Sequence, residues 1–271
     1  MFYLALFFIF LFGLVIGSFL NCLIWRLHTG ENLWGRSYCP KCKAKIAWYD
    51  NIPVLSFIFL RGRCRHCREK ISLQYPLVEL ATGVLFVLAF IIQFFDIQSS
   101  TSITALDKYP ISNIQYLLLI RNWFIIAVMI VVFVYDLRWY LILDAVTLPA
   151  CLVVLGLNLA LGYSWQNVLI SGIIGAGFFL IQFLLSRGRW LGGGDIRLGL
   201  LMGLTLGWPK VILAIFLAYV SGSLVGLSLV AVGKKKWGAK LPLAVFLVPA
   251  TIAVMFWGEQ ILNWYLKLIN F

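Results

Sequence analysis

Long apolar stretches, separated by short polar segments, run along the whole of this chain. Most of them reach the length of about 20 residues that a helix needs to cross the hydrocarbon core of a bilayer. A helix also satisfies its own backbone hydrogen bonds in lipid. The pattern therefore predicts an all-α polytopic membrane protein with about eight transmembrane helices, at residues 2–25, 77–95, 117–135, 144–161, 167–185, 194–208, 211–232 and 241–257.

Two of these segments need separate arguments. The first, Phe2 to Trp25, lacks the basic start and the small-residue cleavage site of a removed signal peptide, so we interpret it as a retained helix. The sixth has an apolar part of only thirteen residues, Ile196 to Trp208, which is short for a hydrocarbon core of about 30 Å. We still expect it to cross, because otherwise Lys234, Lys235 and Lys236 would lie outside, against the charge distribution described next.

The basic residues are concentrated on one side of the predicted membrane. The chain is 62% hydrophobic and 12% charged, with a formal net charge of +12. If the N-terminus is outside, 17 of the 22 Lys and Arg residues fall in cytosolic loops, whereas Arg121 and Arg197 lie near helix ends. This asymmetry follows the positive-inside rule, so the basic charge does not require a nucleic-acid partner. The cytosolic loops are residues 26–76, 136–143, 186–193 and 233–240.

The largest of these loops, residues 26–76, contains two Cys-x-x-Cys motifs. Cys39 and Cys42 form one pair, Cys64 and Cys67 the other, and 21 residues separate the pairs. Four thiolates in this arrangement are typical of a structural zinc ribbon, in which the closed coordination shell leaves no position for water. Two disulfides are the alternative, which a reducing cytosol disfavours. His66 could replace a cysteine ligand, although four thiolates already complete the site.

Four acidic residues lie at the predicted cytosolic edges of helices: Glu79, Asp136, Asp144 and Asp195. Ionised carboxylates are costly near hydrocarbon, so acidic residues there are functional candidates. Two aspartates that meet could share a proton and activate water, as in aspartic proteases. Asp136, which ends the third segment, and Asp195 are the candidate catalytic pair.

Helix capping is the competing explanation for some of these acids. Asp144 opens the fourth segment and is explained by a plain N-cap role. Asp195 could also be a cap, but a cap does not require the three glycines Gly192–Gly194 before it, which allow a close backbone approach. First-turn helix chemistry accounts for Glu79 equally well. The small residues of Ser171–Gly177 lie in the middle of a helix, where they favour close helix packing.

Several sequence blocks carry a family resemblance. Gly17-Ser-Phe-Leu-Asn21 lies in the first predicted helix, the cysteine loop follows, and Gly192-Gly-Gly-Asp195 matches a GxGD motif with Gly192, Gly194 and Asp195 at its fixed positions. With Asp136 and Asp144 as a second acidic segment, the chain resembles the type IV prepilin peptidases, also called prepilin leader peptidase/N-methyltransferases. It departs from the family at Leu143, where a proline is usual.

The resemblance implies an intramembrane aspartic endopeptidase of the bacterial cytoplasmic (inner) membrane. Such an enzyme cuts the basic leader from type IV prepilins or type II secretion pseudopilins after a glycine, and usually methylates the new N-terminus with S-adenosylmethionine. The implied catalytic residues are Asp136 and Asp195, with supporting roles for Gly192, Gly194, Asp144 and Glu79. No residues are assigned to S-adenosylmethionine. The expected parts are a first helix (1–25), a four-cysteine zinc-binding loop domain (26–76) and a membrane peptidase domain (77–271).

Two other functional classes remain open from the residues alone. A cation transporter could use the intramembrane acids as ligands, with the zinc ribbon as a regulatory part. A pilus or secretion assembly factor could use the cysteine loop only for docking. The transporter needs a continuous polar path, but the acids gather on one side of the predicted membrane. Loss of proteolysis without loss of docking, after mutation of Asp136 or Asp195, separates the enzyme from the assembly factor.

Overall fold

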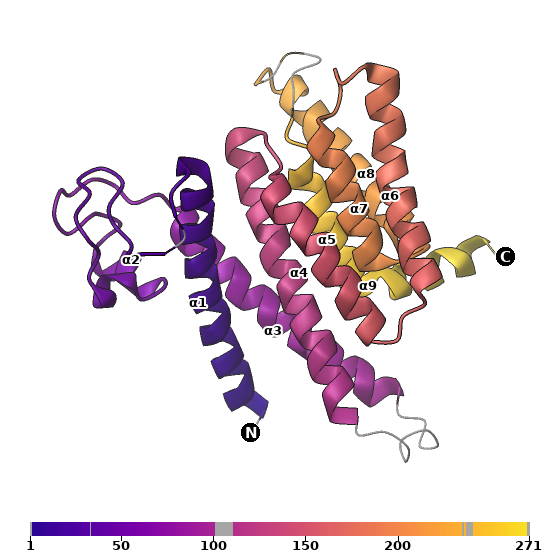
Figure 1. The fold of residues 1–271 in the computed structure, drawn as a ribbon, viewed down its shortest axis with the longest axis horizontal. Helices are drawn as coiled ribbons and strands as arrows, with labels where there is room; N and C mark the ends of the chain where they lie inside the picture. Colours follow the sequence, from indigo (N-terminus) through magenta and orange to yellow (C-terminus); the bar gives the residue numbers. More distant parts are fainter. Residues whose placement is uncertain (1, 33, 101–110, 235, 237–240, 270–271) are drawn as a thin grey trace. The chain divides into compact units, whose positions relative to one another are not determined.

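The computed structural model describes residues 2–32, 34–100, 111–234, 236 and 241–269 of the 271-residue chain. Lys235 and residues 237–240, which belong to one of the predicted cytosolic loops, lie outside the described residues. The described part is helical and contains no strand, only two isolated β-bridges in the cysteine loop. Its elements in chain order are α1 (Phe2–Thr29), η1 (Trp48–Asn51), α2 (Leu55–Phe59), α3 (Gln74–Ser100), α4 (Ile111–Trp139), α5 (Asp144–Ala160), α6 (Trp165–Ser186), α7 (Gly193–Leu206), α8 (Lys210–Ala231) and α9 (Ala244–Ile269) (Figure 1).

Every predicted apolar segment forms a helix, which confirms the all-α membrane fold. Six of the described helices are long and apolar enough to span a bilayer: α1, α3, α4, α6, α8 and α9. The other two are shorter, at 17 residues for α5 and 14 residues for α7. Since an α-helix rises about 1.5 Å per residue, α7 is only about 21 Å long. The predicted sixth span is thus a short helix, bounded by Gly192 and Gly207 at its two ends.

The chain divides into two compact units, residues 1–109 and 110–271. In the first unit, α1 packs along α3 through small residues. A Cβ atom at Gly13 would lie 2.7 Å from the Cα atom of Gly83, and one at Gly17 would lie 2.6 Å from the Cα atom of Glu79. The two backbones therefore approach each other as closely as glycine allows, as small residues permit in membrane proteins.

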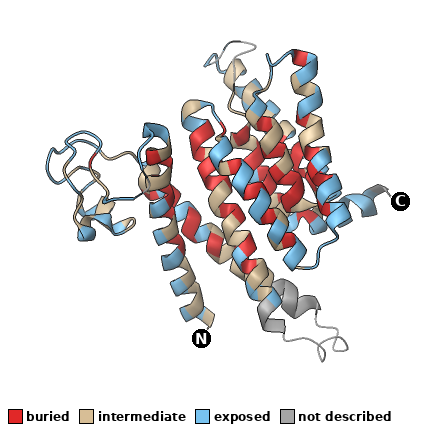
Figure 2. Ribbon diagram, viewed as in Figure 1, coloured by how far each residue is buried: buried red, intermediate tan, exposed pale blue. Residues whose placement is uncertain are grey.

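The second unit is built around α7, which packs on α5, α6, α8 and α9. Its buried residues lie mainly on α4, α7 and α9 (Figure 2). The contact with α6 is made backbone to backbone: a Cβ atom at Gly175 would lie 2.2 Å from the carbonyl oxygen of Gly199, and one at Gly203 would lie 2.1 Å from that of Ser171. The packing role predicted for the small residues of α6 is confirmed at Gly172 and Gly175, whereas Gly177 has no neighbour within 4 Å.

Candidate active site and metal centre

Asp136 lies in the last turns of α4 and is only 5% exposed. Its Oδ2 atom accepts a hydrogen bond of 2.8 Å from the backbone N–H of Ala244, the first residue of α9. The first N–H groups of a helix have no partner within the helix, and they carry the positive end of its dipole. The buried carboxylate therefore satisfies a helix terminus that is 108 residues away in the sequence.

Asp195 is the third residue of α7 and is 8% exposed. Its Oδ2 atom accepts a hydrogen bond of 3.0 Å from the backbone N–H of Gly192, so the carboxylate closes back over the start of its own helix. The sequence left open whether Asp195 caps its helix. This hydrogen bond is part of such a capping interaction, and it holds the side chain in place. This single hydrogen bond leaves the carboxylate able to accept others, because a carboxylate has about four lone-pair sites.

The three glycines before Asp195 have different surroundings. A Cβ atom at Gly194 would lie 2.7 Å from the Cβ atom of Ile142, in the connection before α5. A Cβ atom at Gly193 would meet nothing within 4 Å. Close approach of the backbone to Ile142 therefore requires glycine at position 194, and the other side of the same turn is open.

An electrostatic interaction acts between the carboxyl groups of Asp136 and Asp195. The two helices that carry them, α4 and α7, both pack on α5 and on α9. The unit thus brings together two buried carboxyl groups, each with a backbone N–H donor. Such a pair can hold one shared proton, with one group as an acid and the other as a base.

Asp144 is not the N-cap of α5, so this interpretation of the sequence was wrong. The N-cap position is Leu143, without any side-chain capping bond, and Asp144 is the first helical residue. Its carboxylate instead pairs with Arg197 of α7, two residues after Asp195. The start of α5 is thereby linked to the first turn of α7 by an ion pair whose side chains are both partly exposed.

Glu79 belongs to the first unit and has a structural contact of its own. It lies beyond the first turn of α3, which contains no acidic residue, so first-turn chemistry does not explain it. Its Oε2 atom accepts a hydrogen bond of 2.8 Å from the backbone N–H of Val54, and the residue is 7% exposed. Val54 has a φ of 61°, which is unusual for a β-branched residue. The buried carboxylate thus anchors a strained turn of the cysteine loop to α3.

The four cysteines of the loop form one cluster. Two matching turns carry them: each Cys-x-x-Cys is followed by a residue with positive φ, Lys43 or Arg68, and is flanked by a β-bridge. The four Sγ atoms lie within 4.8 Å of one another and none is in a disulfide. Backbone hydrogen bonds, first from Cys67 and then from His66, lower the pKa of the Cys64 thiol to about 7. The cluster can hold a metal ion, and the disulfide alternative does not match it.

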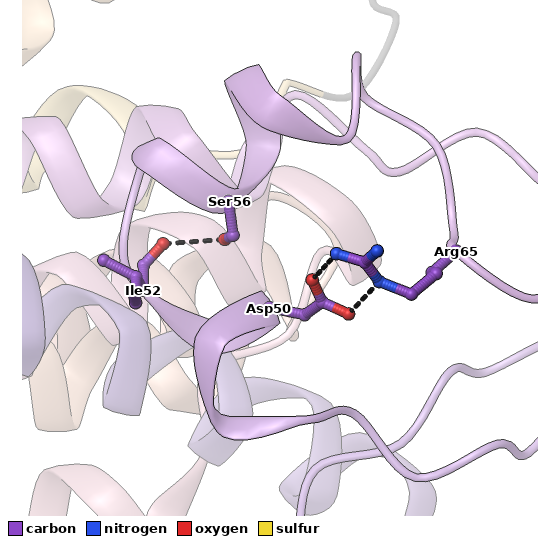
Figure 3. A network of polar contacts seen from close by, with 4 residues as sticks. All are labelled: Asp50, Ile52, Ser56 and Arg65. Carbon is purple, nitrogen blue, oxygen red and sulfur yellow. Dashed lines mark hydrogen bonds and ion pairs between the residues drawn. The ribbon is translucent and has the colours of Figure 1, made fainter.

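An ion pair stabilises the loop beside this cluster. Arg65, within the second Cys-x-x-Cys turn, donates to both carboxylate oxygens of Asp50, at 2.7 Å from Nε and 2.5 Å from Nη2 (Figure 3). This bond holds the pKa of Asp50 below its usual value. In the same view the Ser56 hydroxyl donates to the carbonyl oxygen of Ile52 at 2.6 Å (Figure 3). The bidentate contact ties η1 to the second turn of the cluster.

Sequence reasoning missed the groups that hold the acids. The N–H of Ala244 carries no sequence signal, since every residue other than proline has one. Arg197 was recognised only as a basic residue near a helix end. Its position two residues after Asp195, in a chain with few charges, is the signal that could have paired it with Asp144.

Comparison with known proteins assigns both parts of the chain. Residues 11–93 match the bacterial peptidase A24 N-terminal domain, and residues 123–227 match the type IV leader peptidase family. A prepilin leader peptidase/N-methyltransferase of Aeromonas salmonicida (strain A449) is 30% identical, over 96% of this chain and 94% of the relative. Proteins of that name from Legionella pneumophila (28%, over 94% and 92%) and Klebsiella pneumoniae (35%, over 78% and 89%) are also similar. No solved structure matches.

Proposed function

The chain belongs to the type IV leader peptidase family, and from this membership we propose that it removes the leader of prepilins or pseudopilins by aspartic proteolysis and then methylates the new N-terminus. The observation that carries the proteolytic part is the pair of buried carboxyl groups of Asp136 and Asp195 within one helical unit. The names of the similar proteins state both activities, and these proteins match nearly the whole length of this chain.

The proposed cleavage is direct hydrolysis by water. One aspartate, ionised, takes a proton from the water molecule, which then attacks the scissile carbonyl. The other aspartate, protonated, donates a hydrogen bond to the carbonyl oxygen and stabilises the charge that develops there. A coupled pair titrates as a unit, so neither role is assigned to a particular residue. Gly194 supports the site by letting the start of α7 approach Ile142 closely, and Gly192 supports it by donating its backbone N–H to Asp195.

The substrate class follows from where the acids lie in the chain. Asp136 and Asp195 border the loops 136–143 and 186–193, which the distribution of basic residues puts on the cytosolic side of the inner membrane. A prepilin leader is basic and its following segment is an apolar helix. Its charge keeps the leader out of the bilayer, so the scissile bond would lie at the depth of the two acids.

Zinc is the metal that we propose for the cysteine cluster. Four Zn–S bonds of about 2.3 Å place neighbouring sulfur atoms about 3.8 Å apart in a tetrahedron. The Cys39 and Cys67 Sγ atoms are 3.9 Å apart, and those of Cys42 and Cys64 are 4.0 Å apart. Four thiolates close the coordination shell, which supports a structural role. The described side chains do not single out a site for S-adenosylmethionine, which would supply the transferred methyl group.

Purified protein is therefore expected to contain about one zinc ion per chain, as a tetrathiolate site predicts. Replacing Cys64 by serine should release the metal and expose the loop to protease, because a metal site of this kind contributes directly to folding. Metal analysis and limited proteolysis of the two proteins measure both effects. Cys22→Ser, outside the cluster, is the matched control. Two disulfides and no metal in freshly isolated protein would contradict the assignment.

The decisive test of the proposed function is cleavage in detergent of a synthetic prepilin with a basic leader, a Gly–Phe junction and an apolar helix. The expected product ends after the glycine, and S-adenosylmethionine then adds a methyl group to the new phenylalanine. Mass spectrometry distinguishes both products. Absence of cleavage by folded, metal-loaded protein would refute the proposal and favour the transporter or the assembly factor.

The orientation of the protein can be tested separately. Cysteines placed at Leu141 and Arg189, both exposed, should react with a membrane-impermeant maleimide only when the cytosolic side is accessible. Peptide mass spectrometry can locate the label, which separates these positions from the native cysteines. Labelling of either position from the outside of intact cells would mean that at least one of the two loops is not cytosolic. This result would exclude the proposed substrate geometry.

A further inference from the structure

Arg121 is a buried arginine in the first half of α4, 6% exposed. Removing a guanidinium from water without a partner costs several kcal/mol, so its contacts need an explanation. Among the ion pairs of the described residues, none includes Arg121. Its bonds go to neutral groups: Nε donates to Asn158 Oδ1 at 2.5 Å, Nη1 donates to Asn122 Oδ1 at 3.1 Å, and Nη2 donates to the carbonyl oxygen of Thr205.

These bonds converge on the C-terminus of α7. The helix ends at Leu206, and the carbonyl oxygen of Thr205 belongs to its last turn. The neighbouring carbonyl of Leu204 accepts a hydrogen bond of 2.6 Å from Asn158 of α5. The last carbonyl groups of a helix lack partners and carry the negative end of its dipole. A buried cation at this position therefore completes α7 both electrostatically and by hydrogen bonding.

The same two helices carry the two aspartates at their other ends. Along α4, Asp136 follows Arg121 by fifteen residues, which is about 22 Å of helix. Along α7, Asp195 precedes Thr205 by ten residues, which is about 15 Å. The two helices thus run in opposite directions, linked by Arg121 at one end and bearing the carboxyl pair at the other.

At its C-terminal end, α7 is held by polar contacts as well as by packing. The chain enters it through Gly192–Gly194 and leaves it at Gly207, which has a φ of 72°. Its closest neighbour is α6, where backbone contacts backbone at Gly175 and Gly199 and the Leu204 side chain packs on Gly172. The clamp formed by Arg121, Asn158 and the last carbonyls of α7 adds directional hydrogen bonds to this apolar packing.

We propose that Arg121 is a positioning residue for cleavage: with Asn158, it holds α7 at a fixed height beside α4 and so keeps Asp195 opposite Asp136. This inference rests on the proposed function. A displacement of about 1 Å at a reacting group can cost about 100-fold in rate, so a helix that slides would lower kcat while the substrate still binds.

The test compares Arg121→Lys and Asn158→Ala with a control at the same end of the unit. Lysine keeps the positive charge but cannot form the same fork of bonds. Lys210→Met removes a different cation, whose ion pair is with Glu259 of α9 at 2.8 Å. Each protein is assayed for cleavage of the synthetic prepilin and for methylation of the same peptide already lacking its leader. Both clamp variants should lose about 10- to 100-fold in kcat, with KM changed less than about 3-fold and methylation unchanged, whereas the control cleaves normally.

Different failures have different meanings. Absence of cleavage by the unmodified protein would refute the proposed function itself. If the unmodified protein cleaves, normal kcat in Arg121→Lys and Asn158→Ala would overturn the clamp. An equal loss of cleavage and methylation would also overturn it, because this result indicates a general loss of folded protein.

Discussion

Asp136→Asn and Asp195→Asn are each expected to lower leader cleavage by at least about 1,000-fold, because a neutral amide can act neither as the base nor as the acid of the pair. Asparagine is nearly isosteric with aspartate, and its carbonyl oxygen can still accept the N–H of Ala244 or Gly192. The variants should therefore remain folded and retain the metal. Cleavage kinetics, with methylation of a leaderless peptide as the internal check, measure the difference.

Asp144→Asn is the matched control for these two substitutions. It removes a carboxylate at the same end of the same unit, but one that is half exposed and pairs with Arg197. Exposed ion pairs contribute about 0–1 kcal/mol, so the loss of activity should stay within about 5-fold. Full activity in Asp195→Asn would exclude the proposed mechanism.

Gly194→Ala is expected to reduce cleavage by about 100-fold, because its Cβ atom would lie 2.7 Å from that of Ile142 and would push the start of α7 away. Gly193→Ala adds the same methyl group one residue earlier, where there is open space. It should change the rate by no more than about 2-fold, as is usual for substitutions without steric conflict.

The comparison of these neighbouring alanine variants separates two explanations of the triple glycine. If flexibility of the turn matters most, both substitutions should impair cleavage equally. If close packing matters, only Gly194→Ala should do so, and Ile142→Gly, which removes the clashing Cβ atom, should partly restore its activity. Equal impairment, or no restoration, would contradict the packing explanation.

Much of the architecture could be predicted from local patterns. Apolar length alone located the eight longest helices of the described residues, since burial in lipid acts on each segment separately. The spacing of Cys39, Cys42, Cys64 and Cys67 likewise indicated a metal site, because each pair shares one tight turn. The predicted end of the sixth helix was two residues too late, because Gly207 and Trp208 continue the apolar run but lie beyond the end of α7.

The partners that hold the side chains of the candidate site could not be predicted from local sequence patterns. Asp136 and Arg121 bind backbone groups of α9 and α7, and a backbone N–H or carbonyl looks the same at every position. Such partners are determined by how the helices pack, across 108 and 84 residues of sequence. For the same reason Asp144 was interpreted from its neighbours in the chain, whereas its partner lies 53 residues away.

The shortness of α7 bears on how a hydrolase inside a bilayer obtains its second reactant. A helix of about 21 Å in a hydrocarbon layer of about 30 Å creates a hydrophobic mismatch of about 9 Å. Bilayers accommodate short segments by thinning locally, at a cost of fractions of a kcal/mol per Å. If the shortfall lies at the Gly192 end, the polar loop before α7 reaches below the surface of the hydrocarbon layer. We then expect the length of one helix, rather than a channel through the protein, to give water access to Asp195.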